Sequence, residues 1–190
     1  MKPLIPMNFP LENYKAHFAH YAGDMTHAEG FESELTDEES FLLRAGGLPK
    51  KGVPYFYFDT SIHEWRNLPL DSYLVCLGTC EGPQTRHYIF LDLDHKVYIR
   101  WANGHVEFVN SSLSCLMRSL LAYSEWLESI EQIVEHSGSY LIQNEDIFEL
   151  YYQLRSIDQE AIHPDGLWMY LMEEYPVFEV EQPYLDESLG

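Results

Sequence analysis

NSSLSCLMRSLLAYSEWLESIEQIVEH, residues 110–136, is the stretch of this sequence that decides the fold. Its apolar residues recur at steps of three and four, so in an α-helix they share one stripe. They are Leu113, Leu116, Met117, Leu120, Tyr123, Leu127, Ile130 and Val134. Asn110, Ser111 and Ser112 offer oxygens that can cap the first turn, and Gly138 can end the helix. At ~1.5 Å per residue this helix would span roughly 36 Å, the width of a small domain. We therefore expect a sheet to pack against it.

Segments typical of β-strands precede this helix. Residues 53–59 (VPYFYFD) are dense in aromatic and β-branched side chains, and residues 73–78 (YLVCLG) form a continuous apolar run. Two more candidate strands follow, at residues 87–92 and 96–101. A tight Asn103-Gly104 turn then leads into the last strand, at residues 105–109. The predicted fold class is α+β, with an antiparallel β-meander of about four to six strands packed against a long central helix with flanking helices.

The flanking helices are predicted on both sides of the meander, at residues 11–22, 36–45, 145–155 and 166–175. Thr36 and Glu39 match the capping box, and Gly47 and Pro49 stop that helix. The tail from residue 176 is acidic, and we expect it to lie loosely on the surface. No internal repeat or linker divides the chain, so residues 1–190 are predicted to form a single domain.

The negative charge is concentrated towards the C-terminus. Of the net −20, residues 1–49 carry eight acids against three bases, and residues 50–118 carry seven of each sign. Residues 119–190 carry sixteen acids against Arg155. Such a field repels nucleic acid and anionic membranes and would attract a basic partner. The alternative interpretation is that the acids serve only solubility.

The composition indicates a cytoplasmic protein. No run of 18 apolar residues occurs, and residues 1–10 lack the pattern of a signal peptide. Cys76, Cys80 and Cys115 are too few for a disulfide framework and are interpreted as small buried hydrophobes.

The sequence does not indicate an enzyme, and no cofactor or metal is predicted. His17, His20, Asp24 and His27 form the most metal-like cluster, but Gly23 would end the helix between its two halves. No nucleophile elbow, phosphate-binding glycine loop or dinucleotide fingerprint occurs. A metal-dependent hydrolase that uses His17, His20 and Asp24 stays a third hypothesis, after two non-catalytic functions.

Three motifs in order resemble a known family. FLLRAGGLP (41–49), FVNSSLSCLMRSL (108–120) and SIDQEAIHPDGLWMYLMEEY (156–175) are similar to the SUKH superfamily, in particular to its fourth subfamily of bacterial immunity proteins of polymorphic-toxin systems. The resemblance covers residues 35–175. Where the family pattern places a glycine in the hairpin before Trp101, this chain has Asp94-His95-Lys96.

The resemblance implies an α+β fold and an immunity protein that binds a toxin domain, often a nuclease. It also implies structural roles for the motif residues: Gly47 and Pro49 end a helix, Asn110 and Ser111 cap another, and Trp168 packs in the core. The charge agrees independently, because a nuclease must be basic to hold phosphate and an acidic inhibitor associates faster with it.

The leading hypothesis is therefore an immunity protein that neutralises a basic toxin through an acidic surface with a few aromatic anchors. Because strands alternate and Phe56 and Phe58 share one face, Tyr55 and Tyr57 emerge on the other, which the chain's own helices or a partner would cover. The candidate partner-binding residues are Glu125, Glu128, Glu131, Glu135, Tyr55 and Tyr57. The alternative is an acidic regulatory scaffold or nucleic-acid mimic that binds a basic host protein.

Overall fold

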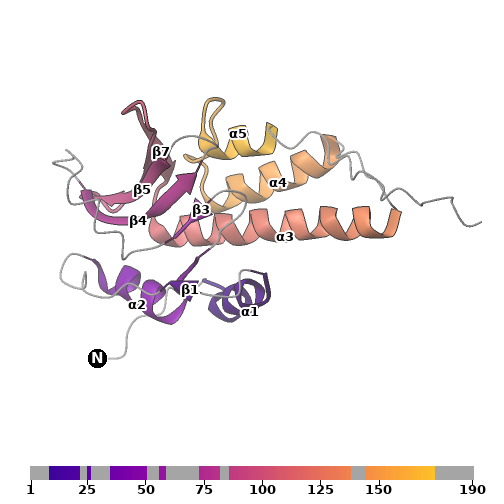
Figure 1. Ribbon diagram of the computed structural model, residues 1–190, viewed down its shortest axis with the longest axis horizontal. Helices are drawn as coiled ribbons and strands as arrows, with labels where there is room; N and C mark the ends of the chain where they lie inside the picture. Colours follow the sequence, from indigo (N-terminus) through magenta and orange to yellow (C-terminus); the bar gives the residue numbers. More distant parts are fainter. Residues whose placement is uncertain are drawn as a thin grey trace, which may run out of the picture.

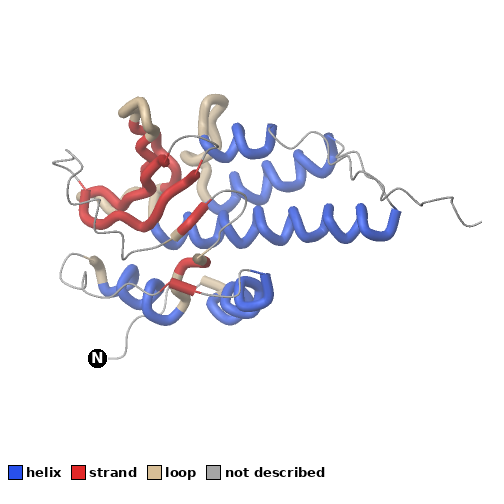
Figure 2. The backbone as a smooth tube through the Cα atoms, viewed as in Figure 1, coloured by secondary structure: helices blue, strands red, loops and turns tan. Residues whose placement is uncertain are grey.

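The computed structural model describes residues 9–21, 25–26, 35–50, 56–58, 73–81, 86–137 and 144–173. Its elements in chain order are α1 (Leu11–Tyr21), β1 (Met25–Thr26), α2 (Asp37–Ala45), β2 (Leu48–Pro49), β3 (Phe56–Tyr57), β4 (Tyr73–Glu81), β5 (Arg86–Asp92), β6 (Val97–Arg100), β7 (Val106–Asn110), α3 (Leu113–Ser137), α4 (Asn144–Ile157) and α5 (Leu167–Glu173). The α+β class is confirmed (Figures 1 and 2). The predicted tail from residue 176 lies outside the described residues.

The strands form the predicted antiparallel meander. Within the described residues, five strands pair in the order β3-β4-β5-β6-β7, so each strand neighbours the next one in the chain. β4 extends to Glu81, beyond the predicted end at Gly78. Gly78 lies inside the strand. A side chain is excluded at this position, because a Cβ would come within 2.3 Å of the Tyr57 carbonyl oxygen. The glycine therefore permits a close approach of β3 and does not mark a turn.

A second, smaller sheet was not predicted. β1 and β2 pair antiparallel, with Met25 opposite Pro49 and Thr26 opposite Leu48. The Thr26 hydroxyl donates to the Phe58 carbonyl at 2.6 Å, which joins this pair to the chain after β3. Two-residue strands carry no detectable periodicity, so the sequence pattern could not indicate them.

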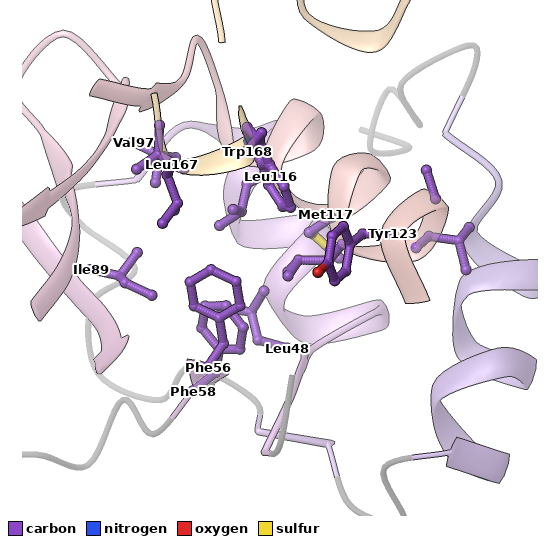
Figure 3. Packing of buried hydrophobic residues seen from close by; sticks show 14 of the residues in the cluster. Leu48, Phe56, Phe58, Ile89, Val97, Leu116, Met117, Tyr123, Leu167 and Trp168 are labelled. Atoms are coloured by element: carbon purple, nitrogen blue, oxygen red, sulfur yellow. The ribbon is translucent and has the colours of Figure 1, made fainter. Parts of the chain in front are cut away.

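The long helix α3 is the centre of the core. Figure 1 shows α1 and α2 on one side of α3 and α4 and α5 on the other, with the sheet near the end where α3 begins. Of the predicted stripe, Leu113, Met117, Tyr123 and Ile130 are among the buried residues. Trp126, outside that stripe, is buried too, because helices flank α3 on two sides. Figure 3 shows the core, whose labelled residues are Leu48, Phe56, Phe58, Ile89, Val97, Leu116, Met117, Tyr123, Leu167 and Trp168.

Of the three residues predicted to cap α3, Ser112 does so, since its Oγ accepts from the Cys115 N–H at 3.1 Å. The prediction is wrong for Asn110 and Ser111, which bind Asp158 instead: its Oδ2 accepts from the Asn110 amide at 3.1 Å and from the Ser111 N–H at 2.7 Å. The Trp168 indole donates to Asn110 Oδ1 at 3.2 Å. We call these four residues the Asp158 network.

In the β5–β6 hairpin, a histidine occupies a backbone position that favours glycine. His95 has a φ of 61°, in the left-handed region that L-residues avoid. Its Nδ1 lies 2.9 Å from Glu39 Oε2. The same carboxylate oxygen accepts from the Thr36 N–H at 2.8 Å, which completes the capping box of α2. The unfavourable backbone conformation of His95 is therefore offset by its contact with Glu39, which connects the hairpin to α2.

Removal of the Asp158 carboxylate should destabilise the fold strongly. Asp158 is buried at 5% exposure, so Asp158→Ala leaves the Ser111 N–H without this acceptor and the Asn110 amide with only its longer contact to Ser119 Oγ at 3.4 Å. We expect the free energy of unfolding to fall by about 3 kcal/mol, measured by urea denaturation at an unchanged m-value. Asp165→Ala, at an exposed aspartate of the next loop, is the control and should change it by less than about 0.5 kcal/mol. Equal effects of the two substitutions would show that the network contributes nothing.

The effect of His95→Gly on stability should depend on whether residue 39 is Glu or Gln. His95→Gly relieves a left-handed residue, worth about 1 kcal/mol, but loses a hydrogen bond to a buried carboxylate, worth about 2 kcal/mol. We expect a net loss of about 1 kcal/mol in the wild-type chain. In a Glu39→Gln background, which keeps the capping box, the same substitution should be neutral or stabilising. A thermal or urea double-mutant cycle measures this, and additive effects would contradict the coupling.

Candidate protein interaction surface

The described acids between residues 119 and 157 lie on the helices α3 and α4. The second half of α3 extends away from the sheet, and α4 lies beside α3 (Figure 1). The acids of this region are Glu125, Glu128, Glu131 and Glu135 on α3 and Glu145, Asp146 and Glu149 on α4. The bases on these two helices are Arg118, near the sheet end of α3, and Arg155, near the end of α4.

The four predicted glutamates of α3 are not equivalent. Glu125 and Glu131 are exposed. Glu128 is partly buried, and its Oε2 lies 3.6 Å from His17 Nδ1 on α1. Glu135 belongs to α3, but the structure does not describe its side chain. Glu125 and Glu131 are thus open to a partner, whereas Glu128 also takes part in the packing of α1 on α3.

Of the two predicted tyrosines, the structure describes Tyr57, which lies in strand β3 of the sheet. Tyr55 is outside the described residues. Tyr57 in β3 is 37% exposed, while its neighbours Phe56 and Phe58 are buried, so the predicted alternation of faces is confirmed. The sheet face away from the core carries a row of rings in contact across four strands: Tyr73, Phe90, Tyr98 and Phe108. These four rings are buried or partly buried where they pack on one another. Tyr57 is therefore more exposed than any of them.

Two exposed aromatic residues on α4 were missed at the level of sequence. Phe148 is 57% exposed and Tyr152 65%, one helical turn apart. Glu145 and Glu149 are exposed on the same stripe, since positions 145, 148, 149 and 152 follow the i, i+3, i+4, i+7 spacing. We call these four residues the α4 ridge. The available signal was the periodicity itself, because the buried stripe of α4 contains Leu150 and Leu154 and excludes both rings.

The α4 ridge stands on a fixed support. Leu150 and Leu154 are fully buried on the opposite side of α4. The Trp126 indole of α3 donates to the Asp146 carbonyl at 3.1 Å near the start of α4, and the Asp158 N–H donates to the Leu154 carbonyl at its end. Packing and hydrogen bonds at both ends therefore hold the ridge in one orientation towards solvent.

Only part of the candidate metal-binding cluster His17, His20, Asp24 and His27 is described by the structure. His17 Nε2 lies 2.7 Å from Ser124 Oγ, and the other ring nitrogen faces Glu128, so the ring joins α1 to α3. His20 is exposed, and Asp24 and His27 are outside the described residues. In the part of the chain that the structure describes, no three His, Cys, Asp or Glu residues are grouped so as to hold a metal ion.

The cysteines and His87 show how burial controls titration in the sheet. Burial raises the pKa of the Cys76 thiol to about 11, so this group stays a neutral apolar side chain at pH 7. Cys80 is buried as well, and Cys115 is partly buried beside the Ile157 carbonyl. Burial lowers the pKa of His87, whose Nδ1 accepts the Ala102 N–H at 3.0 Å and whose ring contacts Trp101.

Comparison of the chain with protein-family models, curated proteins and solved structures found no match. The resemblance to the SUKH superfamily therefore depends on the three motifs of the sequence. Two of these motifs meet in space, since Asn110 and Ser111 of one bind Asp158 of another. None of the described helices has the length and apolar character needed to cross a membrane.

The burial of His87 predicts an acid-sensitive contribution to stability. Its pKa is lower in the folded chain than in the unfolded chain, so unfolding takes up a proton and stability falls as the pH drops through the ordinary histidine range near 6.5. Urea denaturation at pH 7.5 and pH 5 should show a larger loss for the wild type than for His87→Gln. The same pH dependence in both proteins would mean that His87 contributes nothing to it.

Proposed function

We propose that this protein is a cytoplasmic immunity protein that binds and neutralises a basic toxin domain through the acidic helical end of the molecule. The observation that carries the proposal is the α4 ridge, where two exposed rings lie beside two exposed carboxylates in the most acidic part of the chain. The resemblance of residues 35–175 to SUKH immunity proteins supports the same function. A cytoplasmic location is where such a protein would protect the cell that makes the toxin.

The charge distribution would act mainly on the rate of association. Exposed carboxylates on α3 and α4 sum to a negative field at one end of the molecule, while residues 50–118 are neutral overall. A basic domain that approaches is therefore attracted to the helical end and oriented before contact. Once contact is made, desolvation of the rings of Phe148 and Tyr152 would supply the slow dissociation, because buried aromatic anchors dominate interface energies.

The first test identifies the partner and its charge. Affinity capture of the tagged chain from its source cells, washed at low and high salt, should recover one basic toxin-like domain that high salt releases. Co-expression of the two proteins should then relieve the growth defect that the toxin domain causes alone. Recovery of an ordinary basic host protein in its place would favour the alternative of an acidic regulatory scaffold, and it would overturn the immunity proposal.

Neutralisation of the acidic end should slow association. A variant with Glu125→Gln, Glu131→Gln, Glu145→Gln and Glu149→Gln removes exposed carboxylates from α3 and α4. We expect its association rate with the captured domain to fall by about tenfold at low salt and to depend less on salt, with a smaller change in dissociation rate. Stopped-flow or surface plasmon resonance measures both rates.

A control variant with the same change in net charge locates the effect. Glu12→Gln, Glu38→Gln, Asp94→Asn and Asp165→Asn remove four exposed acids from other parts of the described surface. If the two variants lose association rate equally, total charge is sufficient and the acidic end has no special role. If neither variant loses it, the electrostatic part of the proposal is wrong.

A further inference from the structure

The α4 ridge has a more specific chemistry than an acidic patch. Phe148 and Tyr152 lie one helical turn apart, as do Glu145 and Glu149, so rings and carboxylates alternate along one stripe. Side chains at this spacing are separated by about 6 Å at their Cβ atoms. The ridge therefore presents two flat apolar groups and two anionic groups to the same side.

The chain leaves both rings of the ridge largely open. Phe148 is 57% and Tyr152 65% exposed, although the neighbouring Tyr151 shows that the chain can cover a ring here. The Arg155 guanidinium lies over the Tyr151 ring at 5.9 Å and donates to its hydroxyl at 3.2 Å. The Arg155 cation next to the ridge thus contacts Tyr151, whose ring also meets the Tyr152 ring edge-to-face at a centroid distance of 5.4 Å. Most of the surface of Phe148 and Tyr152 is nevertheless exposed and open to a partner.

The surface complementary to this ridge must combine cations with flat apolar platforms at a short repeat. Proteins that hold single-stranded nucleic acid have such a surface: basic side chains follow the phosphates, and aromatic side chains stack on the bases. A double helix is a poorer analogue of the ridge, because its bases are stacked inside and only its charges face outward. The geometry therefore favours a groove for a single strand over a site for a duplex.

We propose that the α4 ridge inserts into the single-strand-binding groove of the basic partner, where Phe148 and Tyr152 occupy the places of stacked bases and Glu145 and Glu149 those of phosphates. This inference rests on the proposed function, since it names the region of the partner that α4 contacts. The protein then inhibits by competition with nucleic acid for one groove. Binding of the ridge and binding of a single strand exclude each other.

The test uses the basic domain captured above and a short fluorescein-labelled single-stranded oligonucleotide. Addition of the full-length protein should displace the oligonucleotide, with a fall in fluorescence anisotropy and no ternary complex in size-exclusion chromatography. A Phe148→Ala/Tyr152→Ala variant should bind the domain about 100-fold more weakly and displace the oligonucleotide correspondingly less well. Glu145→Gln/Glu149→Gln should weaken binding mostly at low salt.

Matched controls separate the ridge from exposed apolar groups in general. Tyr170→Ala on α5 and Leu93→Ala in the β5–β6 hairpin truncate side chains exposed by 49% and 57%, and they should leave binding within about twofold. Unfolding curves of all variants should match the wild type, because each changed side chain is solvent-exposed.

The outcomes distinguish this inference from the proposed function. A stable ternary complex of the protein, the domain and the oligonucleotide overturns the inference and leaves the immunity function intact. Wild-type affinity of the Phe148→Ala/Tyr152→Ala variant does the same. Failure to recover any basic partner overturns the proposed function, and this inference with it.

Discussion

The buried carboxylate of Asp158 is the interaction on which the arrangement of the helices depends. It accepts from Asn110 and from the Ser111 N–H, and Asn110 accepts from the Trp168 indole. One carboxylate therefore connects the end of β7, the start of α3 and the loop after α4, with α5 attached through Trp168. A buried charge is tolerated only where its hydrogen bonds are made, so these elements can pack in few other arrangements.

The orientation of the α4 ridge follows from this network. At the C-terminal end of α4, the Asp158 N–H donates to the Leu154 carbonyl. At the N-terminal end, the Trp126 indole donates to the Asp146 carbonyl. Leu150, between these anchors, is fully buried, so the opposite stripe of α4 faces solvent. The proposed contact surface is thus a rigid ridge supported by the core, which lowers the conformational entropy lost on binding.

The separation of charge and structure along the chain has a physical consequence for function. The sheet comes from the neutral middle of the sequence, and most of the excess acids belong to residues after 118. Like charges on neighbouring helical turns cost some stability, and the fully buried leucines of α4 and the network at its end offset that cost. On α3 and α4, therefore, the buried face contributes to stability and the exposed face carries the negative charge.

The sequence by itself determined the helices and the strands of the five-stranded meander, though not the two-residue strands β1 and β2, because periodicity, the Thr36 capping box and the Asn103-Gly104 turn are local properties of the chain. It also determined the charge asymmetry. Tertiary structure alone decided that Asn110 binds Asp158 instead of capping α3 and that His95, at a positive φ, pairs with Glu39. Such contacts join residues far apart in the chain, and no local pattern encodes them.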